Sequence, residues 1–238
     1  MLVPVRVLVL ILVAAALACR GTDSARRESG SSPEAVSTPV AAAAARPSTS
    51  MPTDSISERA DHGRIRGNAK ATLWIIEASD FQCPFCKMWH DSTYGSLVKN
   101  YVESGRARLA YLNYPLSQHQ NAMPAAEAAM CASVQDRFWP MHDSLFATQE
   151  RWETLPNAMP VFDSTAARIG VTMPAWRDCV AKHLTRPLID ADYERSRTAG
   201  VRSTPTFFVG DQQLSGYQPY SFFRQVVEAQ LSKHAAGR

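Results

Sequence analysis

The sequence feature that most constrains the fold is a pair of cysteines separated by two residues, Cys83 and Cys86. The apolar run at 73–76 ahead of them is short and rich in β-branched and aromatic side chains, which favours a buried strand. Pro84 suits the first turn of a helix, because its missing N–H would have no partner there. We therefore expect a strand, a turn that carries Cys83, and a helix with Cys86 one turn inside it.

This placement favours redox chemistry of the two thiols. The positive end of a helix dipole stabilises a thiolate, so we predict a lowered pKa for Cys83 and the role of the attacking or attacked sulfur. Cys86 would point back into the fold and act as the resolving thiol. A zinc site and a purely structural disulfide remain alternatives. Zinc usually needs four ligands, however, and the sequence has no second Cys-x-x-Cys pair.

The first residues have the pattern of a secretory signal peptide, which we assign to 1–18. Arg6 precedes an apolar stretch that is short for a membrane span, and small residues follow it. We therefore expect an exported protein. Cys19 comes next and resembles the lipid-bearing cysteine of bacterial lipoproteins, although Ala16 stands where such signals usually have Leu. We predict lipidation of Cys19, with secretion of an unmodified chain as the alternative.

Residues 19–60 are rich in Ser, Thr, Ala and Pro and lack apolar periodicity, so we predict a flexible linker. The remaining segment, 61–238, is long enough for one domain with its own core. The linker has no core, which argues against a dimerisation domain, and we expect a monomer. The formal net charge is +3 and the basic residues are scattered, so we expect no nucleic acid partner.

The pattern after the cysteines predicts a mixed α/β domain. The predicted elements are a helix over 87–103, a strand over 106–116, helices within 117–199, a hairpin with strands at 206–209 and 213–217, and a closing helix from about Pro219. Within the helical segment, Thr172 is predicted to cap a helix with one buried face. That face comprises Trp176, Cys179, Val180 and His183.

Two motifs together resemble a known family. The strand, the Cys-Pro-Phe-Cys motif at 83–86 and the helix, followed much later by Ser-Thr-Pro-Thr-Phe-Phe-Val-Gly at 203–210, resemble the DsbA-like thiol–disulfide oxidoreductases of the thioredoxin superfamily. The likeness runs from roughly residue 67 to residue 231. It implies an α/β fold, namely a thioredoxin fold with an all-helical insertion at about 117–199.

The resemblance also implies where a substrate would bind. The peptide bond between Thr204 and Pro205 would be cis and would face the dithiol. The backbone of Thr204 would then pair with an extended substrate segment, as an added strand does. Pro84 and Phe85, between the two cysteines, would contact the substrate as well.

Two further roles follow from the resemblance. Glu77 stands at the position of a buried acid, which we expect to exchange a proton with Cys86; a salt bridge to a neighbouring Lys or Arg is the alternative. Cys131 and Cys179 are predicted to form a structural disulfide, as cysteines at similar places do in many relatives; two separate buried thiols are the alternative. If Cys19 carries lipid, the other cysteines form an even set, as an oxidising compartment favours.

The resemblance implies an enzyme, a protein-disulfide oxidoreductase of the periplasm or another part of the cell envelope. We predict that it donates disulfides to exported proteins and is reoxidised by a membrane redox partner. Phe85 stands where strongly oxidising relatives have His, so we expect a less oxidising pair, and a disulfide reductase or isomerase remains an alternative. A membrane-tethered Cu(I)-binding module is an alternative of another class. For the redox enzyme we expect no cofactor and no metal.

Overall fold

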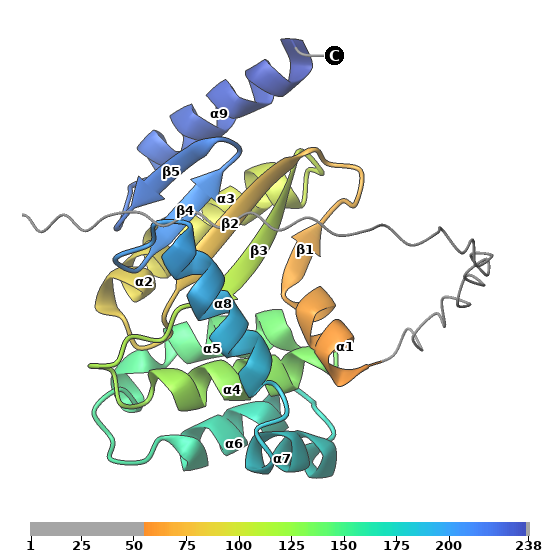
Figure 1. Cartoon of the computed structure of the whole chain (residues 1–238), viewed down its shortest axis with the longest axis vertical. Helices are drawn as coiled ribbons and strands as arrows, with labels where there is room; N and C mark the ends of the chain where they lie inside the picture. Colours follow the sequence, from red (N-terminus) through yellow and green to blue (C-terminus); the bar gives the residue numbers. More distant parts are fainter. Residues whose placement is uncertain (1–54, 237–238) are drawn as a thin grey trace, which may run out of the picture. The chain divides into compact units, whose positions relative to one another are not determined.

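The computed structural model describes residues 55–236 (Figure 1). The predicted signal peptide, Cys19 and most of the predicted linker lie outside the described residues. No helix in the described part is long and apolar enough to cross a membrane.

One five-stranded sheet carries the site, with the strand order β1-β3-β2-β4-β5. The strands are β1 (Ile65–Gly67), β2 (Leu73–Ser79), β3 (Ala107–Asn113), β4 (Thr206–Val209) and β5 (Gln212–Ser215). The central strand β2 is parallel to β3 and antiparallel to β4. A parallel pair requires a crossover connection, and a helical segment supplies it here.

The crossover between β2 and β3 confirms the helix and strand predicted there. It is one run of helical backbone comprising α2 (Pro84–Trp89), η1 (His90–Tyr94), α3 (Gly95–Leu97) and η2 (Val98–Val102). The segments η1 and η2 are π-helical. Gly105, with φ +76°, follows the last turn, where a left-handed residue commonly ends a helix.

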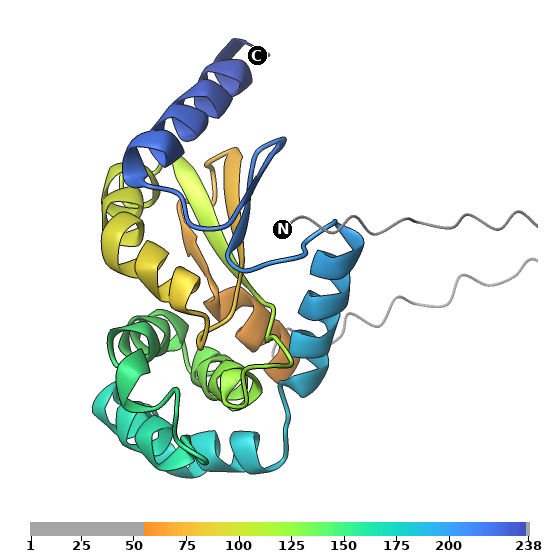
Figure 2. The same cartoon turned by 90° about the vertical axis from the view of Figure 1, so that its left-hand side faces the viewer.

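Helices cover both faces of the sheet, as Figure 2 shows with the sheet nearly edge-on. The crossover helices and α9 (Tyr220–Ala236) pack on one face, where they bury Trp89, Tyr101 and Phe223 with the sheet residue Phe207. The helix α8 (Arg186–Thr198) lies on the other face, where Tyr193 packs on Tyr114 with ring centroids 4.6 Å apart.

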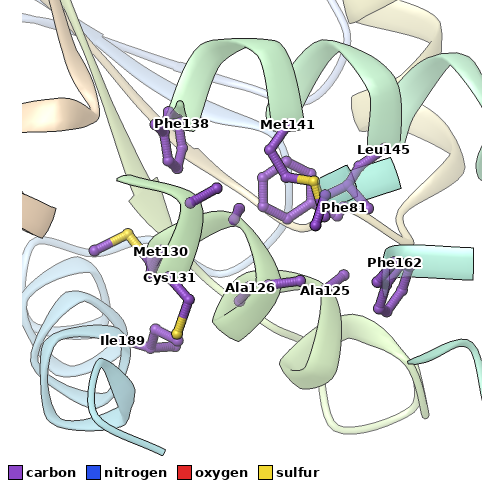
Figure 3. Close-up of a cluster of buried hydrophobic side chains, with 14 of the residues drawn as sticks. Phe81, Ala125, Ala126, Met130, Cys131, Phe138, Met141, Leu145, Phe162 and Ile189 are labelled. Carbon is purple, nitrogen blue, oxygen red and sulfur yellow. The ribbon is translucent and has the colours of Figure 1, made fainter. Parts of the chain in front are cut away.

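The predicted all-helical insertion is confirmed between β3 and β4. It contains α4 (Ala122–Ser133), α5 (Phe138–Ala147), η3 (Gln149–Arg151), α6 (Met159–Arg168), α7 (Met173–Ala181) and α8. The central helix α4 is almost wholly buried, and its many alanines let the neighbouring helices approach closely. Figure 3 shows α4 in contact with Phe138, Met141 and Leu145 of α5, with Phe81 reaching in from the β2–α2 turn.

The predicted linker boundary needs correction. Helix α1 (Ile56–Gly63) begins inside the segment assigned to the linker, so the boundary at residue 60 falls within a helix. The only residue of α1 that is fully buried is Ala60, and its carbonyl accepts a hydrogen bond from Ser133 Oγ at 2.6 Å. Contact between small residues, rather than an apolar stripe, holds α1 on α4, and periodicity does not reveal such a helix.

The predicted helix face after Thr172 is shorter than expected. Thr172 does precede α7 with an extended backbone, but its side chain makes no capping hydrogen bond. Trp176 and Cys179 are buried, whereas His183 is exposed and left-handed, with φ 52°. Because α7 ends at Ala181, His183 lies in the turn that follows and does not extend the face.

Candidate active site

The two cysteines lie where β2 gives way to α2. Cys83 is the N-cap residue of α2 with an extended backbone, Pro84 occupies the first turn, and Cys86 follows inside the helix. Both thiols are free and buried, with Cys83 3% exposed and Cys86 fully covered. The backbone N–H of Cys83 donates to the carbonyl of Asp80 at 3.1 Å, which closes the turn.

The two thiols differ in acid strength. The pKa of Cys83 is lowered to about 6, and the largest cause is a hydrogen bond from the Cys86 side chain. The backbone N–H groups of Phe85 and Cys86 lower it further, whereas burial acts in the opposite direction. Burial raises the pKa of Cys86 well above its usual value. At neutral pH the structure therefore favours a thiolate at Cys83 and a neutral thiol at Cys86.

The loop before β4 lies directly against Cys83. The Thr204–Pro205 peptide bond is cis, and the Thr204 carbonyl oxygen is 3.5 Å from Cys83 Sγ. The loop is held from both sides, because Thr206 is paired with Ala78 of β2 and the Pro205 carbonyl accepts the N–H of Gly216 at 2.7 Å. The structure thus brings together the two stretches that the family resemblance assigned to one site.

Glu77 lies in the centre of the sheet, opposite Tyr111 of β3 and Phe207 of β4. Its side chain is fully buried, and neither carboxylate oxygen has a hydrogen-bond partner or a salt bridge among residues 55–236. Burial raises the pKa of Glu77 to about 7, against smaller opposing effects of Ser79 and His90. Around neutral pH this carboxyl can therefore both give and take a proton.

Asp80 shapes the turn between Glu77 and Cys83 and was not predicted as a site residue. Its buried carboxylate accepts the backbone N–H groups of Gln82 at 2.7 Å and Leu116 at 2.9 Å, and it pairs with His119 Nδ1 at 2.6 Å. The hydrogen bond to Asp80 raises the pKa of His119. The sequence did carry a signal, since an Asp whose side chain accepts the N–H two residues on is typical of a turn.

The helical insertion also holds the dithiol turn through an amide side chain. Gln149 of η3 is buried and donates from Nε2 to the carbonyls of Phe81 at 2.6 Å and Cys83 at 3.2 Å. Such buried carbonyls need partners, and here the partner comes from a helix far along the chain. Sequence reasoning had no signal for this contact.

The surface next to Cys83 is apolar. Pro84 is exposed, and Phe85 and Met88 are 56% and 47% exposed, which is high for large apolar side chains. Pro84 and Phe85 thus lie where a partner that reaches Cys83 would contact them.

The remaining predicted cysteine pair is joined. Cys131 of α4 and Cys179 of α7 form a disulfide with Cα atoms 5.8 Å apart. These are the two cysteines that the family resemblance paired.

Three side chains of metal-binding type lie where η1 meets α5. Ligand atoms of His90, His142 and Asp143 lie within 4.8 Å of one another. His142 Nδ1 is 2.7 Å and His90 Nε2 is 3.6 Å from the same oxygen, Asp143 Oδ1. Sequence analysis did not single out this cluster, because η1 and α5 meet only in the folded chain.

Comparison with known proteins agrees with this geometry. A family model described as thioredoxin matches residues 59–229. The chain belongs to the thioredoxin family. The chain is 20% identical to disulfide bond formation protein D of Bacillus subtilis over 70% of this chain and 76% of that protein. It is also 31% identical to Na(+)/H(+) antiporter NhaA 3 of Salinispora tropica over 75% of this chain. The matched stretch is only 26% of that longer protein.

Solved structures show the same fold. The chain resembles α-DsbA1 of Wolbachia pipientis with a TM-score of 0.66 and 19% identity, covering 73% of this chain and 93% of that one. It resembles oxidised BdbD of Bacillus subtilis with a TM-score of 0.65 and 20% identity, covering 72% and 94%. The predicted thioredoxin fold with a helical insertion is therefore confirmed.

Proposed function

We propose that this chain is a thiol–disulfide oxidoreductase that donates disulfides to exported proteins through Cys83 and Cys86. The observation that carries the proposal is the difference between the two sulfurs. Cys83, with its lowered pKa, touches the cis-proline loop and adjoins the exposed Phe85, whereas Cys86 is sealed inside. One sulfur is thus suited to exchange with a partner and the other to complete the reaction internally.

The reaction follows from this difference. A substrate thiolate attacks Cys83 Sγ of the oxidised pair, the bond between the two cysteines breaks, and Cys86 keeps the electron pair. Glu77 protonates the buried Cys86 sulfur. A second substrate thiolate then attacks the substrate sulfur of the mixed disulfide, and Cys83 departs as a stable thiolate. The substrate gains a disulfide, and both cysteines are left reduced.

The loop and the apolar surface would hold the substrate. The backbone of Thr204 would pair with an extended segment next to Cys83, and Pro84, Phe85 and Met88 would bury its apolar side chains. Apolar contact suits an enzyme that acts on unfolded chains, because the apolar side chains that folding will bury are still accessible in them.

Location and partners belong to the same proposal. The segment at 1–18 would direct export, and lipid on Cys19 would keep the domain close to a membrane. A membrane redox partner would reoxidise the pair, and the enzyme would work as a monomer in the periplasm or cell envelope. In support, one structural relative is described as a periplasmic thioredoxin-like protein, from Salmonella enterica.

The reduction potential of the Cys83–Cys86 pair tests the direction of the reaction. The purified chain is equilibrated in glutathione buffers, and the reduced fraction is measured by thiol trapping. We expect a value between about −120 and −180 mV, the range of disulfide donors, because a low Cys83 pKa stabilises the reduced form. A value near about −270 mV, as in thioredoxin, would instead make the chain a reductase. Cys83→Ser should abolish exchange in either case.

A further inference from the structure

Three side chains from two distant parts of the chain converge where the crossover helix meets the insertion. His90 begins the π-helical segment η1, and His142 and Asp143 lie in α5. One nitrogen or oxygen atom from each residue lies within 4.8 Å of the other two. π-Helical turns are frequent at functional sites. None of the three residues takes part in the proposed exchange reaction, so the cluster needs an explanation of its own.

The carboxylate of Asp143 links the two histidines. Its Oδ1 atom is 2.7 Å from His142 Nδ1 and 3.6 Å from His90 Nε2. Among residues 55–236, Asp143 forms no ion pair with a Lys or Arg side chain, and its ion-pair contacts are with the two histidines alone. The Asp143 side chain is 48% exposed, so ions in solution can reach the carboxylate.

His90 directs a ring nitrogen without a hydrogen-bond partner at this carboxylate. Its other nitrogen, Nδ1, lies 3.2 Å from Asp91 Oδ1, and Lys87 Nζ holds Asp91 in place at 2.7 Å. Donation from Nδ1 to Asp91 fixes the tautomer in which Nε2 carries the lone pair. His90 Nε2 is buried and forms no hydrogen bond in the described part of the chain. A histidine that binds a metal commonly has this arrangement, with its second nitrogen donating to a carboxylate.

His142 supplies the third atom. Its side chain is fully buried, and Phe81, Tyr111 and Phe146 lie nearly perpendicular to its ring, with interplanar angles of 74°, 83° and 79°. Its Nε2 has no hydrogen-bond partner among residues 55–236. Faces of aromatic rings attract an N–H edge and repel a lone pair, so we place the ring proton on Nε2. The lone pair of His142 is then on Nδ1, next to Asp143 Oδ1.

Three lone pairs therefore meet, on His90 Nε2, His142 Nδ1 and Asp143 Oδ1. Acceptor atoms at this spacing repel one another unless a cation lies between them. A proton can join the pair that is 2.7 Å apart, but the 3.6 Å between Asp143 Oδ1 and His90 Nε2 is too long for a hydrogen bond. A metal ion can contact all three atoms at once.

The atoms and their spacing suit zinc. Two imidazoles and one carboxylate are a known set of zinc ligands, with a fourth position left for water. Two ligands of a tetrahedral zinc ion, each with a bond of about 2.0 to 2.1 Å, lie about 3.3 Å apart. The measured separations of 2.7 and 3.6 Å lie on either side of this value, so small side-chain movements would complete the site.

We propose that His90, His142 and Asp143 bind one Zn²⁺ ion, with the fourth coordination position open to solvent. None of the ligands is a thiol, so the exchange reaction itself still needs no metal. Because η1 belongs to the crossover and α5 to the helical insertion, the ion joins these two parts of the domain. Zinc should therefore stabilise the folded chain, as a ligand does when it binds only the folded state.

The test measures zinc binding to the oxidised chain, in which Cys83 and Cys86 form a disulfide and any other thiol is blocked with iodoacetamide. The protein is stripped with EDTA, freed of it, and titrated with Zn²⁺ by calorimetry at about pH 7.5, because metal binding needs neutral imidazoles. We expect one ion per chain. With free zinc at about 100 times its dissociation constant, the ratio of folded to unfolded molecules in urea should rise about 100-fold. Co²⁺ should show the visible bands of a tetrahedral ion without cobalt–thiolate absorption.

Two substitutions remove ligands that are partly exposed. The His90 and Asp143 side chains are 13% and 48% exposed, so His90→Gln and Asp143→Asn should fold, which circular dichroism checks. Each should weaken zinc binding by about 100-fold or more. Asp91→Asn leaves all three ligands in place and should weaken binding by about ten-fold, because it changes only the carboxylate that orients His90.

A histidine outside the cluster provides the matched control. His183 is 63% exposed and lies 2.9 Å from the Glu127 carboxylate, but it belongs to no group of three metal-binding side chains among residues 55–236. His183→Asn should therefore bind zinc as the parent does; Asn suits the left-handed backbone at this position. Failure of the oxidised parent to bind zinc would overturn the proposal. Parental affinity in both His90→Gln and Asp143→Asn would overturn it as well, because the bound ion would then lie elsewhere.

Discussion

Cys83 and Cys86, three positions apart, have pKa values shifted in opposite directions, and the causes are local. Cys83 lies before the first turn of α2, where Cys86 and backbone N–H groups stabilise its thiolate, whereas Cys86 lies where burial disfavours charge. The sequence predicted the lowered pKa of Cys83 and the inward position of Cys86, because Pro84 places the first turn and the spacing places the second sulfur one turn inside; it did not predict the raised pKa of Cys86. It did not predict the size of the Cys86 contribution, which depends on two side chains meeting.

This difference predicts the alkylation behaviour of the reduced protein. The rate at which iodoacetamide modifies Cys83, followed by mass spectrometry of its peptide, should rise with pH around a midpoint of about 6 and level off above it, because only the thiolate reacts. Cys86→Ala removes the largest cause of the lowered pKa, so the midpoint should move up toward the usual value of about 8.5. An unchanged midpoint in Cys86→Ala would show that the helix terminus alone sets the pKa.

The helix α1 shows what sequence patterns miss when elements pack through small residues. The strand β2 and the crossover helix were predicted because their apolar residues are frequent and regularly spaced. In α1 the contact is made by Gly63, where an added Cβ would lie 2.4 Å from Ser133 Oγ and 2.6 Å from the Ser133 carbonyl oxygen. Only the folded chain shows that a glycine is needed there.

Two glycine substitutions test this packing. Gly63→Ala should destabilise the protein by about 1 to 3 kcal/mol, because α1 must shift away from α4. Gly95→Ala is the matched control: an added Cβ there meets no atom within 4 Å, and the backbone is helical. It should stabilise by about 0.5 to 1 kcal/mol. Urea unfolding followed by circular dichroism measures both, and the same sign of change at the two sites would contradict the packing argument.

The dithiol is packed by the helical insertion as much as by the sheet that carries it. Phe81, Cys83 and Cys86 belong to the buried cluster formed by α4 to α8, and Gln149 holds the carbonyl of Cys83. Composition predicted that the insertion is helical. It did not predict which of its faces meets the site, because the deciding contacts join residues far apart in the chain. For the same reason the cluster of His90, His142 and Asp143 was found only in the structure.

The disulfide between Cys131 and Cys179 should matter for the stability of this insertion and not for the exchange reaction. It joins α4 and α7 across 48 residues, and closing a loop of that length restricts the unfolded chain by up to about 4 kcal/mol in the entropic model. The double substitution Cys131→Ala with Cys179→Ala should therefore lower the free energy of unfolding in urea by up to that amount. The hydrogen bond from Trp176 Nε1 to the Ala128 carbonyl, at 3.1 Å, still joins the two helices, so the variant should fold.

The glutathione exchange rate of this double variant at Cys83 should match the parent when both are measured well below their unfolding midpoints. A variant that keeps full stability would show that the bond constrains little, and one that loses exchange while still folded would place the bond in the function of the site.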